Sequence, residues 1–116
     1  RDNETEKIIS DLFEDGSSIT VLKGANTIIA LPNGKKYIVT DGNPGMATAG
    51  TGDMLAGMIV AFLSQGLSPA DSAICAVKLH AMSGDIAVLK TSELSLTPTD
   101  MIERLPEVFK KIYSTK

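Results

Sequence analysis

Apolar residues at the start of this chain recur with the period of a helix and then with that of strands. Within residues 5–14 they fall on one face of a helix, and Gly16 follows as a stop signal. The β-branched run 19–22 predicts a buried strand that ends at Lys23 and Gly24. This strand is expected to deliver its C-terminal end to a binding site.

Two further strands are predicted at residues 26–31 and 36–40. The segment between them contains Asn33 and Gly34, and Asn-Gly is the strongest short sequence signal for a hairpin. We therefore expect these two strands to be joined by a tight turn.

Residues 41–52 change in composition to Gly, Pro, Ala and Thr, which favours a loop whose backbone approaches a ligand closely. Apolar residues then recur at helical spacing from Met54 to Leu63, and Gly66 follows. The glycine-rich loop is therefore expected to lead directly into the N-terminus of a helix.

Two more helices are predicted from their start signals. Ser68 and Pro69 suit the N-cap and first position of a helix that we expect to run to about Lys90. Thr97 and the residues after it repeat this signal for a last helix, which Pro106 is expected to kink or restart.

Strands and helices of this kind indicate an α/β layered architecture. Three strands make a thin sheet, and both the strand at Val21 and the helix after the loop need partners on more than one side. We therefore expect a large part of the parent sheet to lie N-terminal to Arg1, with residues 1–116 forming the C-terminal portion of a single domain.

Charge and composition argue against several broad functions. Of 116 residues, 11 are Lys or Arg and 14 are Asp or Glu, and the net charge of -3 offers no general attraction to nucleic acid or anionic membrane. The single cysteine, Cys75, lies in an apolar run and is interpreted as core packing. No apolar run is long enough to span a bilayer and the polar start is not a signal peptide, so we expect a cytoplasmic protein.

The segment 42–53 combines two features that suit phosphate chemistry. Free backbone N–H groups of the loop and first helical turn, together with the positive end of the helix dipole, make an anion site. Asp53 places a carboxylate at the rim of that site, where it can take a proton from a hydroxyl while the amides hold the phosphoryl group.

Two better-known glycine motifs do not fit this segment. A Walker A loop needs Lys after its final Gly, but the spacing from Gly45 to Gly50 is followed by Thr51. A dinucleotide-binding fingerprint needs Gly at position 55, which is Leu55.

A specific family resemblance begins in this loop. Residues 43–59, NPGMATAGTGDMLAGMI, resemble the signature of the NAD(P)H-hydrate dehydratases, members of the larger ribokinase-like group. Upstream, residues 22–27 look like that family's Lys-Gly-x-x-Thr nucleotide segment, and downstream residues 79–85 resemble its Leu-His helix. The resemblance implies a ribokinase-like layered fold with a central, mainly parallel sheet flanked by helices, of which this chain is the C-terminal part.

By this resemblance, nucleotide and substrate are held by neighbouring groups. The residues implied in nucleotide binding come from the strand end and the loop: Lys23, Gly24, Ala25, Asn26, Thr27, Asn43, Ala49, Gly50, Thr51 and Gly52. Asp53 would be the catalytic residue and would face the hydrated nicotinamide. No metal site made by the protein is expected, and Mg²⁺ would come with the nucleotide phosphates. Ala49 stands where many relatives carry Gly, a small departure that keeps the loop tight.

The resemblance also implies a reaction and partners. The family repairs NADHX and NADPHX, the 6-hydroxylated forms of NADH and NADPH, with ADP or ATP as phosphoryl donor. Phosphorylation converts the hydroxyl into a good leaving group, and elimination of phosphate regenerates the cofactor. The expected partners are these small molecules, a further copy of the chain in a homo-oligomer, and a fused or separate NAD(P)HX epimerase.

Several of these residues also have a purely structural interpretation. Asp53 can be a first-turn acid that complements the helix dipole, Lys23 can be a lysine exposed to solvent, and Thr27 can be an ordinary strand residue. His80 lies among apolar residues and is interpreted as a packing histidine outside the site. The rival functions are a small-molecule kinase of the same fold, of the hydroxymethylpyrimidine or hydroxyethylthiazole type, and a non-catalytic nucleotide-binding module.

Overall fold

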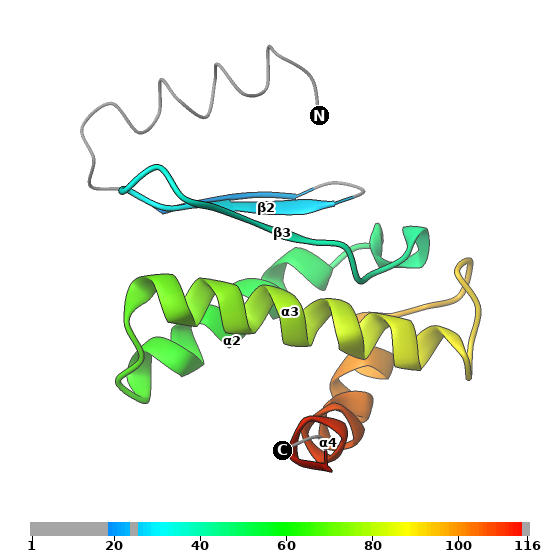
Figure 1. The fold of residues 1–116 in the computed structure, drawn as a ribbon. Helices are drawn as coiled ribbons and strands as arrows, with labels where there is room; N and C mark the ends of the chain where they lie inside the picture. The colour runs from blue at the N-terminus through cyan, green and yellow to red at the C-terminus, as the bar shows by residue number, and fades with distance from the viewer. Residues whose placement is uncertain (1–18, 24–25, 115–116) are drawn as a thin grey trace.

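The fold is a small sheet with helices packed against one face (Figure 1). A computed structural model describes residues 19–23 and 26–114, and the side chains of these as far as residue 111. Its elements are β1 (Thr20–Leu22), β2 (Thr27–Ala30), β3 (Lys36–Val39), η1 (Pro44–Met46), α2 (Thr51–Ser64), α3 (Pro69–Val88) and α4 (Pro98–Ser114). The helix predicted at 5–14 lies outside the described residues.

The three described strands pair in the order β1-β2-β3, and both pairs are antiparallel. The predicted hairpin between β2 and β3 is confirmed: its turn contains Gly34 at φ 86, where a residue without Cβ is favoured. The layered α/β fold is confirmed, and the mainly parallel pairing that the family resemblance implies for the parent sheet does not occur among these three strands. The connections between them are too short for the crossover that parallel strands require.

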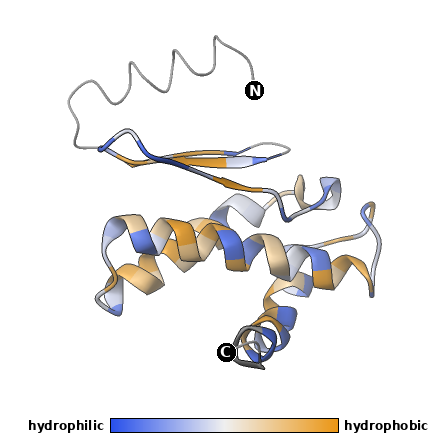
Figure 2. Ribbon diagram, viewed as in Figure 1, coloured by the Kyte–Doolittle hydropathy of each residue, from blue (hydrophilic) through white to orange (hydrophobic). Residues whose placement is uncertain are grey.

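The main core lies between the sheet and the two helices α2 and α3. Ile29 of β2, Val39 of β3 and Leu31, which directly follows β2, contribute buried side chains that meet Leu55 of α2 and Val77 of α3. Figure 2 shows hydrophobic residues over β2 and over much of both helices, where these surfaces meet. Burial of this apolar surface is the main source of stability for the layered arrangement.

Helix α3 begins at its predicted cap and ends close to its predicted end. The Ser68 side chain accepts a hydrogen bond from the Asp71 backbone N–H at 3.1 Å, and Pro69 takes the first helical position. The helix ends at Val88, two residues before the predicted Lys90. Helix α3 runs beneath the whole sheet, so residues far apart along it meet different parts of the loop above (Figure 1).

Helix α4 starts with a reciprocal cap and continues through Pro106. The Thr97 backbone N–H donates to Asp100 Oδ2 at 2.9 Å, and the Asp100 backbone N–H donates to Thr97 Oγ1 at 3.2 Å. The helix was expected to kink or restart at Pro106, but the structure assigns one helix on both sides of it. Met101 and Val108 are fully buried on either side of the proline, and their packing holds both halves against the protein.

Candidate functional site

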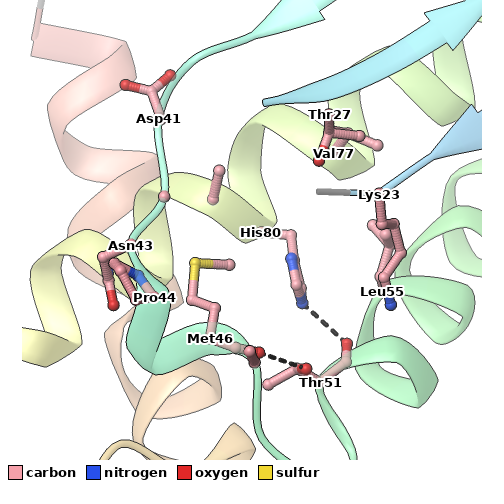
Figure 3. Close-up of a pocket in the computed structure, with 13 residues that line it drawn as sticks. Lys23, Thr27, Asp41, Asn43, Pro44, Met46, Thr51, Leu55, Val77 and His80 are labelled. Carbon is pink, nitrogen blue, oxygen red and sulfur yellow. Dashed lines mark hydrogen bonds between the residues drawn. The ribbon is translucent and has the colours of Figure 1, made fainter. Parts of the chain in front are cut away.

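A cavity of about 590 Å³ opens where the ends of the strands meet α2 and α3 (Figure 3). Its walls come from the end of β1, the start of β2, the loop after β3, the start of α2 and the middle of α3. The lining residues are Lys23, Thr27, Asp41, Gly42, Asn43, Pro44, Met46, Ala47, Thr51, Leu55, Val77, His80 and Ala81. The predicted strand end, glycine-rich loop and helix N-terminus are thus brought to one place.

Lys23 and Thr27 enter the site from the end of β1 and the start of β2. A Cβ atom added at Gly52 would lie 2.8 Å from Lys23 Nζ, so the ammonium group lies directly over the first turn of α2. Asn26 is exposed and does not line the cavity. Gly24 and Ala25 lie outside the described residues, so their predicted role stays a prediction.

The first half of the loop is fixed by side-chain hydrogen bonds. Asn43 is the N-cap of η1, and its Oδ1 accepts a hydrogen bond from the Gly45 N–H at 3.0 Å. Its Nδ2 donates to Asp85 Oδ1 at 2.9 Å, and the Gly42 N–H donates to Asp85 Oδ2 at 2.8 Å. Asp85 therefore connects α3 to the entrance of the loop.

The second half of the loop ends in the N-terminus of α2. Gly50 is the N-cap residue and has a φ of 92, a left-handed conformation that favours glycine. Thr51 Oγ1 donates to the carbonyl of Met46 at 2.7 Å. Among the described residues no acceptor is found for the backbone N–H groups of Gly52 and Asp53. These amides lie at the positive end of the helix dipole, the place where the sequence predicts an anion site, and the anion site itself stays a prediction.

Helical geometry separates the residues of α2 between the cavity and the outer surface. Thr51 and Leu55 are each 6% exposed and line the cavity, because four residues turn a helix by about 400° and bring both to one face. Asp53 lies halfway between them and is exposed. Ala49, Gly50 and Gly52 also lie outside the cavity lining, although they belong to the same loop and helical turn.

Asp53 is therefore not a cavity residue in the described part of the chain. Its carboxylate makes no hydrogen bond or ion pair there, and it stands at the first turn of α2 beside the free amides. A group held by those amides from the outer side would be within reach of this carboxylate. The position suits a base that meets a substrate, and its chemistry depends on what binds at the helix end.

His80 lines the cavity, although sequence reasoning left it out of the site. The residue is 7% exposed, and its Nε2 lies 2.9 Å from the Thr51 carbonyl oxygen (Figure 3). Burial lowers the pKa of this imidazole below its ordinary value of 6.5, the hydrogen bond to Thr51 opposes the shift, and the charge of Lys23 adds to it. A neutral ring that donates from Nε2 to the carbonyl explains both contacts.

The interpretation of His80 as a packing histidine is confirmed by its burial and its hydrogen bond, but its place in the cavity wall was missed. The signal that could have indicated this place is the segment 79–85, which resembles the Leu-His helix of the NAD(P)H-hydrate dehydratases. Met46, Asp41 and Asp85 were missed as well, because their role depends on contacts between α3 and the loop. Asp41 forms an ion pair with Lys78 of α3 beside the cavity.

The described residues contain no group of three or more His, Cys, Asp or Glu side chains placed to hold a metal ion. None of their helices is long and apolar enough to cross a membrane.

Comparison with known proteins identifies the family. The sequence pattern of the NAD(P)H-hydrate dehydratases matches residues 1–107. This chain belongs to the NAD(P)H-hydrate dehydratase family. It is similar to the bifunctional NAD(P)H-hydrate repair enzyme Nnr of Moorella thermoacetica, with 38% identity over 106 residues, which is 91% of this chain and 20% of that protein.

Two solved structures share the fold. The ADP/ATP-dependent NAD(P)H-hydrate dehydratase of Bacillus subtilis, co-crystallised with ATP and Mg²⁺, matches 94% of this chain with 31% identity and a TM-score of 0.79. A ribokinase-like superfamily protein of Enterococcus faecalis matches 81% with 42% identity and a TM-score of 0.67. The chain spans 41% of the first structure and 32% of the second, and about a fifth of the curated relative. The ribokinase-like fold is thereby confirmed.

Proposed function

We propose that this chain is the nucleotide-binding and catalytic part of an ADP- or ATP-dependent NAD(P)H-hydrate dehydratase that returns (6S)-NADHX and NADPHX to NADH and NADPH. The observation that carries the proposal is the arrangement at the first turn of α2. There Lys23 Nζ, two free backbone amides and an exposed carboxylate, Asp53, lie together. Family membership over residues 1–107 supports the same function.

The charge and shape of the first turn of α2 support binding of the nucleotide there. Lys23 and the amides of Gly52 and Asp53 suit the terminal phosphates, because each offers a donor or a positive charge at the end of a helix. The cavity beside them has apolar walls at Leu55 and Val77, which suit the base of a nucleotide. Ala49, Gly50 and Thr51 shape the loop that brings these groups together.

A magnesium ion fits this arrangement only as a partner of the phosphates. The described residues offer no ligand cluster of their own, and Asp41 is already paired with Lys78. Mg²⁺ bound with a nucleotide typically takes most of its ligands from phosphates and water. The co-crystallisation of the Bacillus subtilis relative with ATP and Mg²⁺ agrees with this proposal.

Asp53 is the proposed general base. Its carboxylate is exposed beside the amides that would hold the phosphoryl group, so it can accept the proton of the C6 hydroxyl as that oxygen attacks phosphorus. When bound, the nucleotide supplies the phosphoryl group that makes the hydroxyl a good leaving group. Elimination of phosphate then restores the nicotinamide ring.

The whole protein is proposed to carry a second activity beyond that of this chain. Relatives such as the Moorella thermoacetica enzyme are named bifunctional repair enzymes, which supports a fused NAD(P)HX epimerase activity. A homo-oligomer and a cytoplasmic location complete the proposal.

The function is tested on the full-length protein by supplying NADHX with ADP or with ATP and recording recovery of NADH absorbance. The proposal expects nucleotide-dependent recovery together with release of phosphate. Accumulation of a phosphorylated product without NADH would identify a small-molecule kinase of the same fold. Nucleotide binding without any turnover would identify a binding module, and either result would overturn the dehydratase proposal.

A further inference from the structure

We propose that Asp85 and Asn43 form a positioning pair that fixes the entrance of the glycine-rich loop for nucleotide binding. The inference rests on the proposed function, because it assigns these two residues a role at the same site. Asp85 lies on α3 and is not a lining residue of the cavity. Its effect on the nucleotide must pass through the loop.

The hydrogen bonds of this pair use every polar atom of both side chains. The two Asp85 oxygens accept from the Gly42 N–H and from Asn43 Nδ2, and Asn43 Oδ1 accepts from the Gly45 N–H. Asn43 was predicted to contact the nucleotide, but its amide group is already engaged within the protein. Its proposed role is therefore to shape the turn.

The same part of α3 holds the loop at two further points. A Cβ atom added at Gly84 would overlap Met46 Sδ, so the Met46 side chain rests directly on the glycine. His80 Nε2 contacts the carbonyl of Thr51, where the loop ends. One helical segment thus holds the start, the middle and the end of the loop, and Asp85 holds the start.

Charge and positioning predict opposite effects of removing the Asp85 carboxylate. The Asp85→Asn change deletes a negative charge near the proposed phosphate position, which by Coulomb's law favours anion binding. The same change replaces one acceptor oxygen at position 85 with an NH₂ group, which faces either the Gly42 N–H or Asn43 Nδ2. Because two donors then face each other, one of the two hydrogen bonds of Asp85 is lost. Positioning therefore predicts weaker nucleotide binding, and charge alone predicts tighter binding.

Exchanging the two side chains restores every hydrogen bond. In the double variant Asn43→Asp/Asp85→Asn, the amide at position 85 accepts a hydrogen bond from the Gly42 N–H through its oxygen. Its NH₂ group donates to one oxygen of the carboxylate at position 43. The other oxygen of that carboxylate accepts from the Gly45 N–H as Asn43 does now. The net charge is unchanged, so the exchange separates geometry from charge.

The experiment measures ADP affinity by calorimetry and the KM for ADP in NADHX turnover, using the full-length protein. Asp85→Asn is expected to weaken ADP affinity about tenfold, and Asn43→Asp at least as much, because two carboxylates then face each other. The double variant is expected to return to within about threefold of wild type. The change should appear mainly in KM, since neither residue touches the reacting atoms. Asp71→Asn, an exposed acid on the same helix, is the control and should leave affinity unchanged.

Several outcomes decide the matter. Wild-type or tighter ADP affinity in folded Asp85→Asn would overturn the inference, and so would a double variant that stays as weak as the single ones or does not fold. Recovery of affinity in the double variant supports it even where a single variant is unstable. A wild-type protein that binds ADP but does not recover NADH would instead overturn the proposed function, and the affinity series would still test the pair.

Discussion

Replacing Gly52 with alanine tests whether Lys23 lies over the phosphate position. Gly52 is in the first turn of α2 and does not have a positive φ, so the backbone accepts alanine. The new Cβ would lie 2.8 Å from Lys23 Nζ, a distance that Cβ atoms do not tolerate. The ammonium is the far end of a flexible side chain, so it will move aside and the fold will remain.

The size of the effect follows from the displacement. Reaching an ordinary contact of about 3.5–4.0 Å needs a retreat of roughly 1 Å. At an effective dielectric constant of about 20, moving a unit charge from about 4 to 5 Å from a phosphate charge costs about 0.8 kcal/mol. With a phosphate charge of one to two, ADP affinity should fall roughly fourfold to fifteenfold. Stability should not fall, because alanine exceeds glycine by up to about 1 kcal/mol in helix propensity.

The assay is calorimetric titration with ADP and with ATP, beside urea unfolding of the same proteins. Gly57→Ala is the matched control on the same helix, because an added Cβ there meets nothing within 4 Å. Gly52→Val should abolish binding, since its two methyl groups push Lys23 further and block close approach of the phosphates. Unchanged ADP and ATP affinity in folded Gly52→Ala and Gly52→Val would show that the phosphates do not bind at this turn.

Three further predictions concern the loop, the buried histidine and the chain by itself. Gly45→Ala should lower the free energy of unfolding by roughly 1–3 kcal/mol, because the new Cβ would lie 2.7 Å from the Glu93 Cα, a backbone atom that cannot move aside without disturbing the chain. An unchanged free energy of unfolding in urea would contradict this. Because the pKa of His80 is lowered in the folded protein, its neutral form contributes stability that is fully present above pH 6.5 and is lost as the pH falls through the lower folded pKa. His80→Gln should therefore reduce the pH dependence of the free energy of unfolding, measured with urea, below pH 6.5. The same pH dependence in the wild type and in His80→Gln would contradict this. Residues 1–116 alone should dehydrate NADHX poorly, because the chain spans less than half of its structural relatives, and robust NADH recovery by this chain would refute that expectation.

Local signals in the sequence predicted the local structure well. Asn33 and Gly34 specify the hairpin, and Ser68 with Pro69 specifies the start of α3, because turn and cap preferences act within a few residues. The antiparallel pairing of β2 and β3 follows from the predicted hairpin, whereas the mainly parallel sheet that the family resemblance implies concerns the whole parent domain. Pro106 was expected to kink or restart the last helix, and α4 does not restart there, because the buried residues on both sides of it hold one helix against the protein.

The site was predicted in its segments but not in its individual contacts. Lys23, Thr27 and the loop were expected at one place, and the structure brings them there. His80 and Asp85 come from a helix some 30 or more residues further along, and no local pattern shows which loop atoms they meet. The exposure of Asp53 follows from helical geometry once the first residue of α2 is known. The sequence pattern does not define a helix start to within one residue, so the orientation of Asp53 could not be predicted from it.

The central claim is that Asp53 is the base in NADHX dehydration, and Asp53→Asn in the full-length enzyme tests it most directly. Asn is nearly isosteric with Asp and still suits the first turn of α2, so the fold and the nucleotide affinity should be kept. Turnover of NADHX with ADP or ATP should fall by roughly a hundredfold or more, chiefly in kcat, because the proton moves only as the hydroxyl attacks phosphorus. A folded Asp53→Asn enzyme with near wild-type kcat would contradict the account and remove Asp53 from the mechanism.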